Sequence, residues 1–167
     1  MKTVIILVLT AFLSVPASAQ EVSAVMIVEN DENFAADVTK GQTRSFAPRD
    51  AAGVDLKDFL WTARPVIVFA DSPNDPQFRE QMAMLEQGWP DLRARDVVVI
   101  QDTNPDRATM SDVRRKLRPR GFSLIWIDKD GNVRLRKPVV WSARELTHAI
   151  DKSPIRRQEM LDERTGR

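Results

Sequence analysis

A short polar stretch, DSPND at residues 71–75, brings together the residue types with which this chain could most readily bind or transform a ligand. It follows an apolar run and precedes a predicted helix, and strand-to-helix turns of α/β domains commonly carry functional residues. Asp71 and Ser72 offer a carboxylate and a hydroxyl that could act on a small substrate, although a serine needs a base to activate it. Ser72 and Asn74 also lie where free helix N–H groups could hold an anion.

The same turn has a structural interpretation, which we favour. Asp75 precedes Pro76, and this order predicts that Asp75 is the N-cap of a helix that begins at Pro76. A capped helix satisfies its own N–H groups. Because the carboxylates of Asp71 and Asp75 would repel a second anion, we expect a ligand at this turn to be neutral or cationic rather than a phosphate.

A pair of arginines near the C-terminus, Arg156 and Arg157, forms the second candidate binding site. Guanidinium groups suit the recognition of carboxylates and phosphates, and we place this pair at the end of the last helix. The alternative is that one arginine pairs with an acidic neighbour, Glu159 or Asp162, and so locks the C-terminal segment onto the sheet. We favour this structural role.

Two further charged stretches are weaker candidates. The sequence RRKLRPR at residues 114–120 is the densest basic patch, and it could contact anionic lipid headgroups or polysaccharide. We favour a solvated helix end whose cations complement the helix dipole. The sequence DKDGN at residues 128–132 resembles a calcium loop only superficially, because an EF-hand needs its glycine at the sixth position. It predicts a hairpin turn instead, since Asp-Gly suits a tight primed turn.

The composition excludes several kinds of chemistry. The chain has no cysteine, so it can form neither disulfides nor a thiolate nucleophile. Its single histidine, His148, cannot form a histidine-rich metal site, and we read it as an ordinary helix residue. A formal net charge of +1 argues against wholesale binding to nucleic acid. We therefore predict no catalytic residue, no cofactor and no metal ligand.

The N-terminus predicts export. Residues 1–19 combine Lys2, an apolar core and small residues at Ala17 and Ala19, which is the layout of a cleavable signal peptide. No later segment is apolar enough to cross a membrane, so we expect no integral membrane segment after cleavage and a periplasmic or secreted protein. Residues 20–49 read as an N-terminal arm, 50–162 as one domain and 163–167 as a tail.

The order of predicted elements within the domain is that of an α/β protein. A short helix is expected at 54–60, strands at 65–70, 97–100 and 121–128, and a fourth strand at 133–140. Helices are expected from Pro76, with Gly88 and Pro90 as the stop, at 111–117, and after the capping-box residues Ser142 and Glu145. This order predicts a thioredoxin-like domain with a central mixed sheet of about four strands flanked by helices.

Three stretches together resemble a known family: RPVIVFADSPNDPQFREQ, GFSLIWIDKDGNVRL and the closing IDKSPIRRQEM. They are similar to the thioredoxin- or peroxiredoxin-like domain of unknown function, of the P-DUDES type, found in bacterial exported proteins. The domain also recurs in vertebrate extracellular sushi-repeat and coiled-coil-domain-containing proteins. Arg156, Arg157, Glu159 and Met160 form the most distinctive part of this resemblance.

The resemblance implies a thioredoxin-like fold and a kinship with redox enzymes, without an established activity. The turn that carries Cys-x-x-Cys in a thioredoxin is Asp71, Ser72, Pro73 and Asn74 in this chain, and the position of the expected cis-proline falls at about Ser123. Both halves of a redox site are absent from the sequence. Disulfide exchange and peroxide reduction by a thiolate are therefore excluded.

We accordingly predict an exported, non-catalytic binding or interaction module whose ligand is unknown and whose partner is a protein of the cell envelope. Asp71, Ser72, Asn74, Arg156 and Arg157 are its candidate binding residues. The alternative is a non-thiol enzyme, such as a hydrolase, that uses the Asp71/Ser72 turn. A former redox protein that assists a partner's disulfide chemistry by binding fits the same residues.

Overall fold

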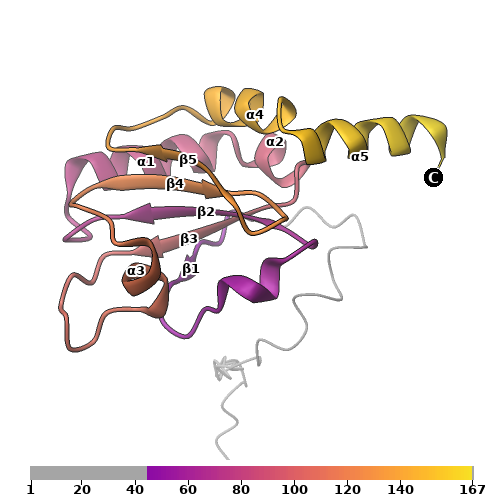
Figure 1. Cartoon of the computed structure of the whole chain (residues 1–167). Helices are drawn as coiled ribbons and strands as arrows, with labels where there is room; N and C mark the ends of the chain where they lie inside the picture. Colours follow the sequence, from indigo (N-terminus) through magenta and orange to yellow (C-terminus); the bar gives the residue numbers. More distant parts are fainter. Residues whose placement is uncertain (1–44, 167) are drawn as a thin grey trace, which may run out of the picture. The chain divides into compact units, whose positions relative to one another are not determined.

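The computed structural model describes residues 45–166, so the predicted signal peptide and nearly all of the predicted arm lie outside the described residues. The described part is built around one five-stranded mixed sheet with the strand order β1-β3-β2-β4-β5 (Figure 1). The strands are β1 (Arg49–Asp50), β2 (Arg64–Phe69), β3 (Val97–Asp102), β4 (Ser123–Ile127) and β5 (Val133–Lys137). The first three run parallel to one another, β4 runs antiparallel to β2, and β5 runs antiparallel to β4.

Helices cover both faces of this sheet (Figure 1). On one face lie α1 (Pro76–Gln87), α2 (Trp89–Arg93) and α4 (Ala143–Asp151), while the 3-10 helix η2 (Leu56–Phe59) and α3 (Asp112–Leu117) lie on the other. The helix α5 (Pro154–Thr165) follows α4 and extends beyond the sheet. Because β2 and β4 are buried on both faces, both strands are apolar along nearly their whole length rather than alternating with polar residues.

Local signals in the sequence account for the boundaries of the main helices. The side chain of Asp75 accepts hydrogen bonds from the backbone N–H groups of Gln77 and Phe78, which confirms the predicted N-cap of α1. The predicted capping box between Ser142 and Glu145 is present at the start of α4. The apolar stripe of α1 packs into the core with β2, β4 and α4. The mixed sheet, with its parallel strands β1, β3 and β2 and its antiparallel strands β4 and β5, confirms the α/β, thioredoxin-like class predicted from the sequence.

Four local predictions need correction. The sheet has a fifth strand, β1, which pairs with β3 at the edge. Pro90 does not end a helix but lies in the first turn of α2, a position where its missing N–H costs nothing. The hairpin turn is not a tight primed turn: the N–H of Asp128 bonds to the carbonyl of Asn132, which leaves a three-residue loop, and within that loop only Gly131 has a positive φ. The last helix is α5 rather than α4, because Ser153 caps a new helix.

None of the helices between residues 45 and 166 combines the length and apolar character required to span a lipid bilayer.

Candidate functional site

The turn at residues 71–75 lies at the carboxyl end of β2, beside the carboxyl end of the parallel strand β3. The register pairs Phe69 with Asp102, so the segments that follow the two strands leave the sheet at the same edge. In open α/β sheets this edge is the usual place for a ligand. The loop 103–110 and the start of α3 therefore become neighbours of Asp71.

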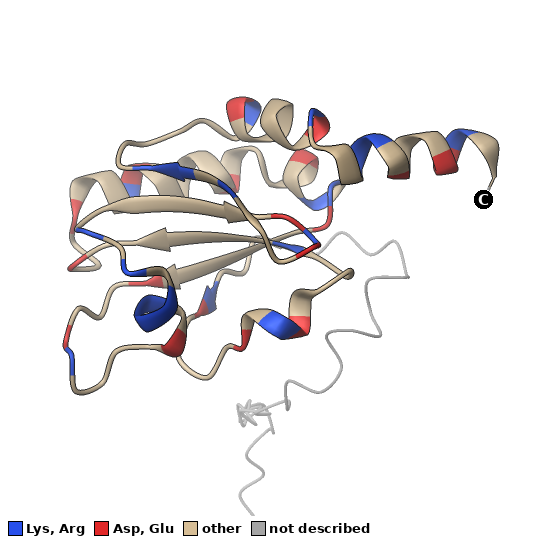
Figure 2. Ribbon diagram, in the orientation of Figure 1, with Lys and Arg blue, Asp and Glu red and all other residues tan. Residues whose placement is uncertain are grey.

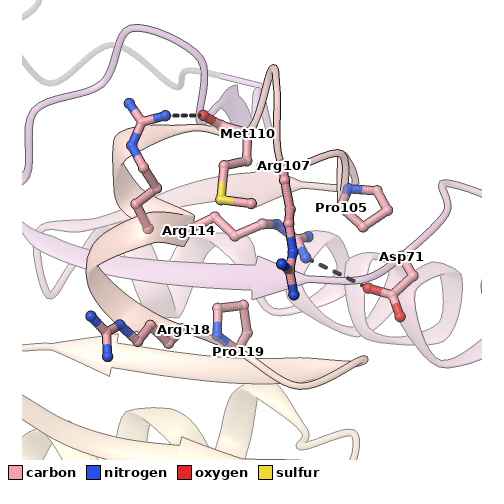
Figure 3. Close-up of a pocket in the computed structure, with 8 residues that line it drawn as sticks. Asp71, Pro105, Arg107, Met110, Arg114, Arg118 and Pro119 are labelled. Atoms are coloured by element: carbon pink, nitrogen blue, oxygen red, sulfur yellow. Dashed lines mark hydrogen bonds and ion pairs between the residues drawn. The ribbon is translucent and has the colours of Figure 1, made fainter.

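An open pocket of about 620 Å³ lies where these segments meet (Figure 3). We call it the arginine pocket. Its lining residues are Asp71, Pro105, Arg107, Met110, Arg114, Arg115, Arg118 and Pro119. The lining thus contains four arginines and one carboxylate, and of these arginines Arg114 faces Asp71 (Figure 3). The proline and methionine side chains supply apolar surface. Basic residues gather on α3 at this edge (Figure 2).

Arg114 is the most firmly held of these arginines. Its Nε donates to a carboxylate oxygen of Asp102 at 2.9 Å. Its Nη2 donates to the carbonyl of Ala70 at 2.6 Å and to the carbonyl of Asp102 at 2.9 Å. The side chain is only 7% exposed, and its guanidinium lies 5.3 Å from the ring centre of Phe69. Arg114 is therefore fixed in one orientation by the ends of both parallel strands.

The remaining nitrogen of Arg114, Nη1, faces Asp71 across a gap of 3.6 Å. This distance counts as an ion pair but is too long for a strong charge-assisted hydrogen bond. The carboxylate of Asp71 is 61% exposed, so water and ligand can reach it. The pocket therefore presents a fixed cation and an accessible anion side by side (Figure 3).

Asp102 does not line the pocket, but it holds in place the segments that do. One of its carboxylate oxygens accepts a hydrogen bond from the hydroxyl of Ser111 at 2.6 Å, and the other accepts from the backbone N–H of Asn104 as well as from Arg114. Ser111 in turn caps α3 by accepting from the N–H of Arg114. One buried carboxylate thus ties the end of β3 to the loop and to α3.

The other candidate binding residues of the turn, Ser72 and Asn74, are joined to each other by a hydrogen bond. The hydroxyl of Ser72 accepts a hydrogen bond from the N–H of Asn74 at 3.2 Å, and the side chain of Asn74 is exposed. Neither residue lines the arginine pocket. Of the predicted turn residues, the structure brings only Asp71 together with the basic patch.

Arg156 and Arg157 lie at the opposite end of the molecule's central strand. Arg156 is within 4.0 Å of Asp151 and forms ion pairs with Glu159 and Glu163, whereas Arg157 is exposed. Glu159 pairs with Arg64, the first residue of β2, while Asp71 follows the last residue of that strand. The two predicted sites are therefore separated by the length of β2, roughly 20 Å.

An ion network around Arg64 explains the role of the closing motif. Arg64 is fully buried, and its Nε donates to Asp128 at 2.9 Å. Its Nη2 lies 2.9 Å from Glu159, which also accepts from Lys129. Burial raises the pKa of Glu159, but the hydrogen bonds from Lys129 and Arg64 outweigh that effect and leave the pKa below its ordinary value. Glu159, rather than Arg156, is the residue that joins α5 to the sheet.

Sequence reasoning missed Arg64, Asp102, Arg107 and Arg114 as individual participants. The sequence did contain a signal for the buried ion pairs. Arg64 and Asp102 lie close to the ends of continuous apolar runs, and a charged residue that is buried with such a run needs a partner. Their partners are 64 and 12 residues away in the chain, so spacing alone could not identify them. Among residues 45–166, no group of three His, Cys, Asp or Glu side chains could hold a metal ion.

Comparison with known proteins identifies a family and several distant structural relatives. Residues 55–159 match the model of a family described as a domain of unknown function, DUF4174. No curated protein matches the chain.

The reduced 2-Cys peroxiredoxin of Plasmodium vivax is 15% identical, with a TM-score of 0.49, over 64% of this chain and 85% of the peroxiredoxin. A chloroplastic thioredoxin z is 20% identical, with a TM-score of 0.49, over 66% of this chain and 99% of the thioredoxin. Strand order and direction, rather than these distant likenesses, define the fold as thioredoxin-like.

Proposed function

We propose that this chain, which belongs to the DUF4174 family of domains of unknown function, is an exported, non-catalytic binding module that holds an anionic group of its ligand in the arginine pocket. The observation that supports this most directly is the arrangement of Arg114. Its guanidinium is buried and fixed through Nε and Nη2, while Nη1 forms no hydrogen bond with any residue between 45 and 166. A donor fixed in this way loses little conformational entropy when an anion binds.

Two further arginines of the pocket provide net positive charge. Arg107 and Arg118 are exposed, and neither guanidinium forms an ion pair or hydrogen bond within the described part of the chain. Arg115 differs, because it is paired with Asp112. Counting the carboxylates of Asp71, Asp102 and Asp112 against the four arginines leaves one net positive charge at the pocket. The two unpaired guanidinium groups favour a ligand with at least one carboxylate or phosphate group.

This proposal differs from the expectation, based on the sequence, that a ligand at the turn is neutral or cationic. That expectation counted the carboxylates of Asp71 and Asp75 and placed the basic stretch 114–120 elsewhere. In the folded chain the carboxylate of Asp75 accepts hydrogen bonds from α1, and Asp71 faces Arg114 of α3. The local charge is therefore positive rather than negative.

The alternative, a non-thiol enzyme that uses Asp71 and Ser72, has less support. Ser72 needs a base, and the chain's single histidine, His148, lies on α4. That helix covers the face of the sheet opposite to α3 (Figure 1). Export and a protein partner in the cell envelope stay predictions. Such a partner would engage the pocket through an acidic side chain.

The experiment that tests the proposal is a titration of the mature protein with succinate and with inorganic phosphate, followed by amide chemical shifts. We expect the largest shifts at residue 71 and at residues 105–119. The variant Arg107→Gln/Arg118→Gln should bind about tenfold more weakly, because it loses two exposed charge pairs worth roughly 0.7 kcal/mol each.

A matched control is the variant Arg79→Gln/Arg144→Gln, which removes the same charge from exposed positions outside the pocket. It should bind both anions as the unmodified protein does. Equal weakening in the two variants would indicate nonspecific attraction to a basic surface. Shifts that avoid the pocket altogether would refute the proposed site.

A further inference from the structure

The pocket contains one feature that a site for simple anions does not require, namely the carboxylate of Asp71. It lies 3.6 Å from Nη1 of Arg114. A resident carboxylate weakens the binding of any anion placed beside it, because like charges a few ångströms apart repel. A site selected only for anions would do better with a neutral residue at this position.

The geometry of this pair leaves both groups available to a ligand. Nη1 keeps its two N–H donors, since the three other N–H groups of Arg114 are used by Asp102 and Ala70. The carboxylate of Asp71 accepts no hydrogen bond from any residue between 45 and 166. A fixed cationic donor and a free anionic acceptor thus stand next to each other in the pocket (Figure 3).

An α-amino acid carries the complementary pair of groups on a single carbon atom. Its carboxylate can accept from Nη1 of Arg114, and its ammonium group can donate to Asp71. The ammonium group then neutralises Asp71, and the repulsion that Asp71 exerts on a simple anion is replaced by attraction. Arg107 and Arg118 remain for a second carboxylate.

We propose, on the basis of the function proposed above, that the ligand of the arginine pocket is a zwitterion with an additional acidic group, of the acidic α-amino acid class. Asp71 and Arg114 hold the ammonium and carboxylate groups. Arg107 and Arg118 hold the side-chain carboxylate. Pro105 and Pro119 line the pocket, whose volume of about 620 Å³ accommodates a molecule of this size.

The test compares two probes that differ only by an ammonium group, L-glutamate and glutarate, on the unmodified protein and on the variant Asp71→Asn. The side chain of Asp71 is exposed, so the variant should fold, and its circular dichroism spectrum checks this. We expect L-glutamate to bind roughly tenfold more weakly to the variant and glutarate to bind several-fold more tightly, since one probe loses an attraction and the other loses a repulsion.

A matched control is Glu80→Gln, which removes one negative charge from an exposed position of α1 outside the pocket. It should leave both affinities unchanged. If Asp71→Asn tightens the binding of both probes, or changes neither, Asp71 does not recognise an ammonium group and the zwitterion proposal fails while anion binding stands. If neither probe binds the unmodified protein and succinate and phosphate also fail, the proposed function itself is refuted.

Discussion

Two arginine side chains, one near each end of β2, are buried, and each of them is paired with a buried carboxylate. Arg64 at the start of the strand is compensated by Asp128 and Glu159, and Arg114 beyond its end is compensated by Asp102. A buried charge without its partner is strongly destabilising, so each arginine ties together segments that are far apart in the sequence. The first arginine is enclosed by its partners and serves the structure, whereas the second keeps one nitrogen open to the pocket.

The pairing of Glu159 leads to a prediction about acid stability. Its folded pKa lies below the ordinary value of 4.5, since the hydrogen bonds from Lys129 and Arg64 outweigh the cost of burial. A lowered folded pKa contributes stability that is present above pH 4.5 and is lost as the pH falls through the folded value. We expect Glu159→Gln to lower the free energy of unfolding at pH 7 and to make its decline below pH 4.5 shallower.

Urea denaturation between pH 3 and pH 7 measures this effect. Glu80→Gln serves as the control, because it removes a carboxylate from an exposed position of α1. The control should keep the stability and the pH dependence of the unmodified protein. Parallel stability curves for the Glu159 variant and the unmodified protein would contradict the role given to the Glu159 pairs.

At the scale of elements, the close approach of α4 to the end of α1 depends on Gly88. A Cβ atom added at this position would lie 2.2 Å from the Cβ of Ala143, the first residue of α4. The backbone of Gly88 has a φ of −95°, which any residue adopts, so packing rather than conformation requires the glycine. This contact places Leu146 and Ile150 of α4 over the core.

We therefore predict that Gly88→Ala destabilises the protein by about 1–3 kcal/mol through overpacking. The double variant Gly88→Ala/Ala143→Gly should recover part of that loss, because the second change removes the clashing methyl group. Thermal or urea unfolding of both single variants and the double variant measures the coupling between the two positions. Strictly additive effects would mean that the two residues do not limit the approach of α4.

The helix α5 is connected to the fold differently from the other long helices. None of its residues is fully buried, and it is held at its first turns by the Glu159 pairs with Arg64 and Lys129. Most of the stability of a protein helix comes from tertiary packing of an apolar face, which α5 largely lacks. Its position therefore depends on charge pairs, whereas α1 and α4 are held by the apolar core.

At the scale of the whole molecule, one edge of the thioredoxin-like sheet carries the arginine pocket. The parallel strands β2 and β3 end beside each other and present the turn at Asp71, the loop 103–110 and α3 to one pocket. The chain contains no cysteine, so this edge has no redox nucleophile.

We predict that the mature protein does not accelerate the reduction of insulin disulfides by dithiothreitol, since no thiolate is available for exchange. The turbidity assay measures this directly, with an active thioredoxin as the positive control. Because disulfides are absent too, dithiothreitol should leave the melting temperature unchanged. A thiol-dependent rate above that of dithiothreitol alone would contradict this reading of the site.

Patterns along the chain were enough to predict the α/β class, the helix caps at Asp75 and Ser142, and the exclusion of thiol chemistry. Each of these depends on residues close together in sequence or on composition alone, so no knowledge of the folded chain is needed. The start of α5 after Ser153 was not predicted, although Ser-Pro is a local signal for a helix start. The prediction instead treated the residues after Ser142 as one last helix that included Arg156 and Arg157.

The arginine pocket could be found only in the folded chain. Asp71 and Arg114 are 43 positions apart, and the sign of the local charge depends on parallel strands that end at one edge of the sheet. Glu159 likewise meets Arg64 only because α5 returns to the start of β2. Electrostatic interactions act through space, so a charge count along the sequence around residue 71 includes only the nearby carboxylates, whereas the tertiary arrangement places Arg114 3.6 Å from Asp71.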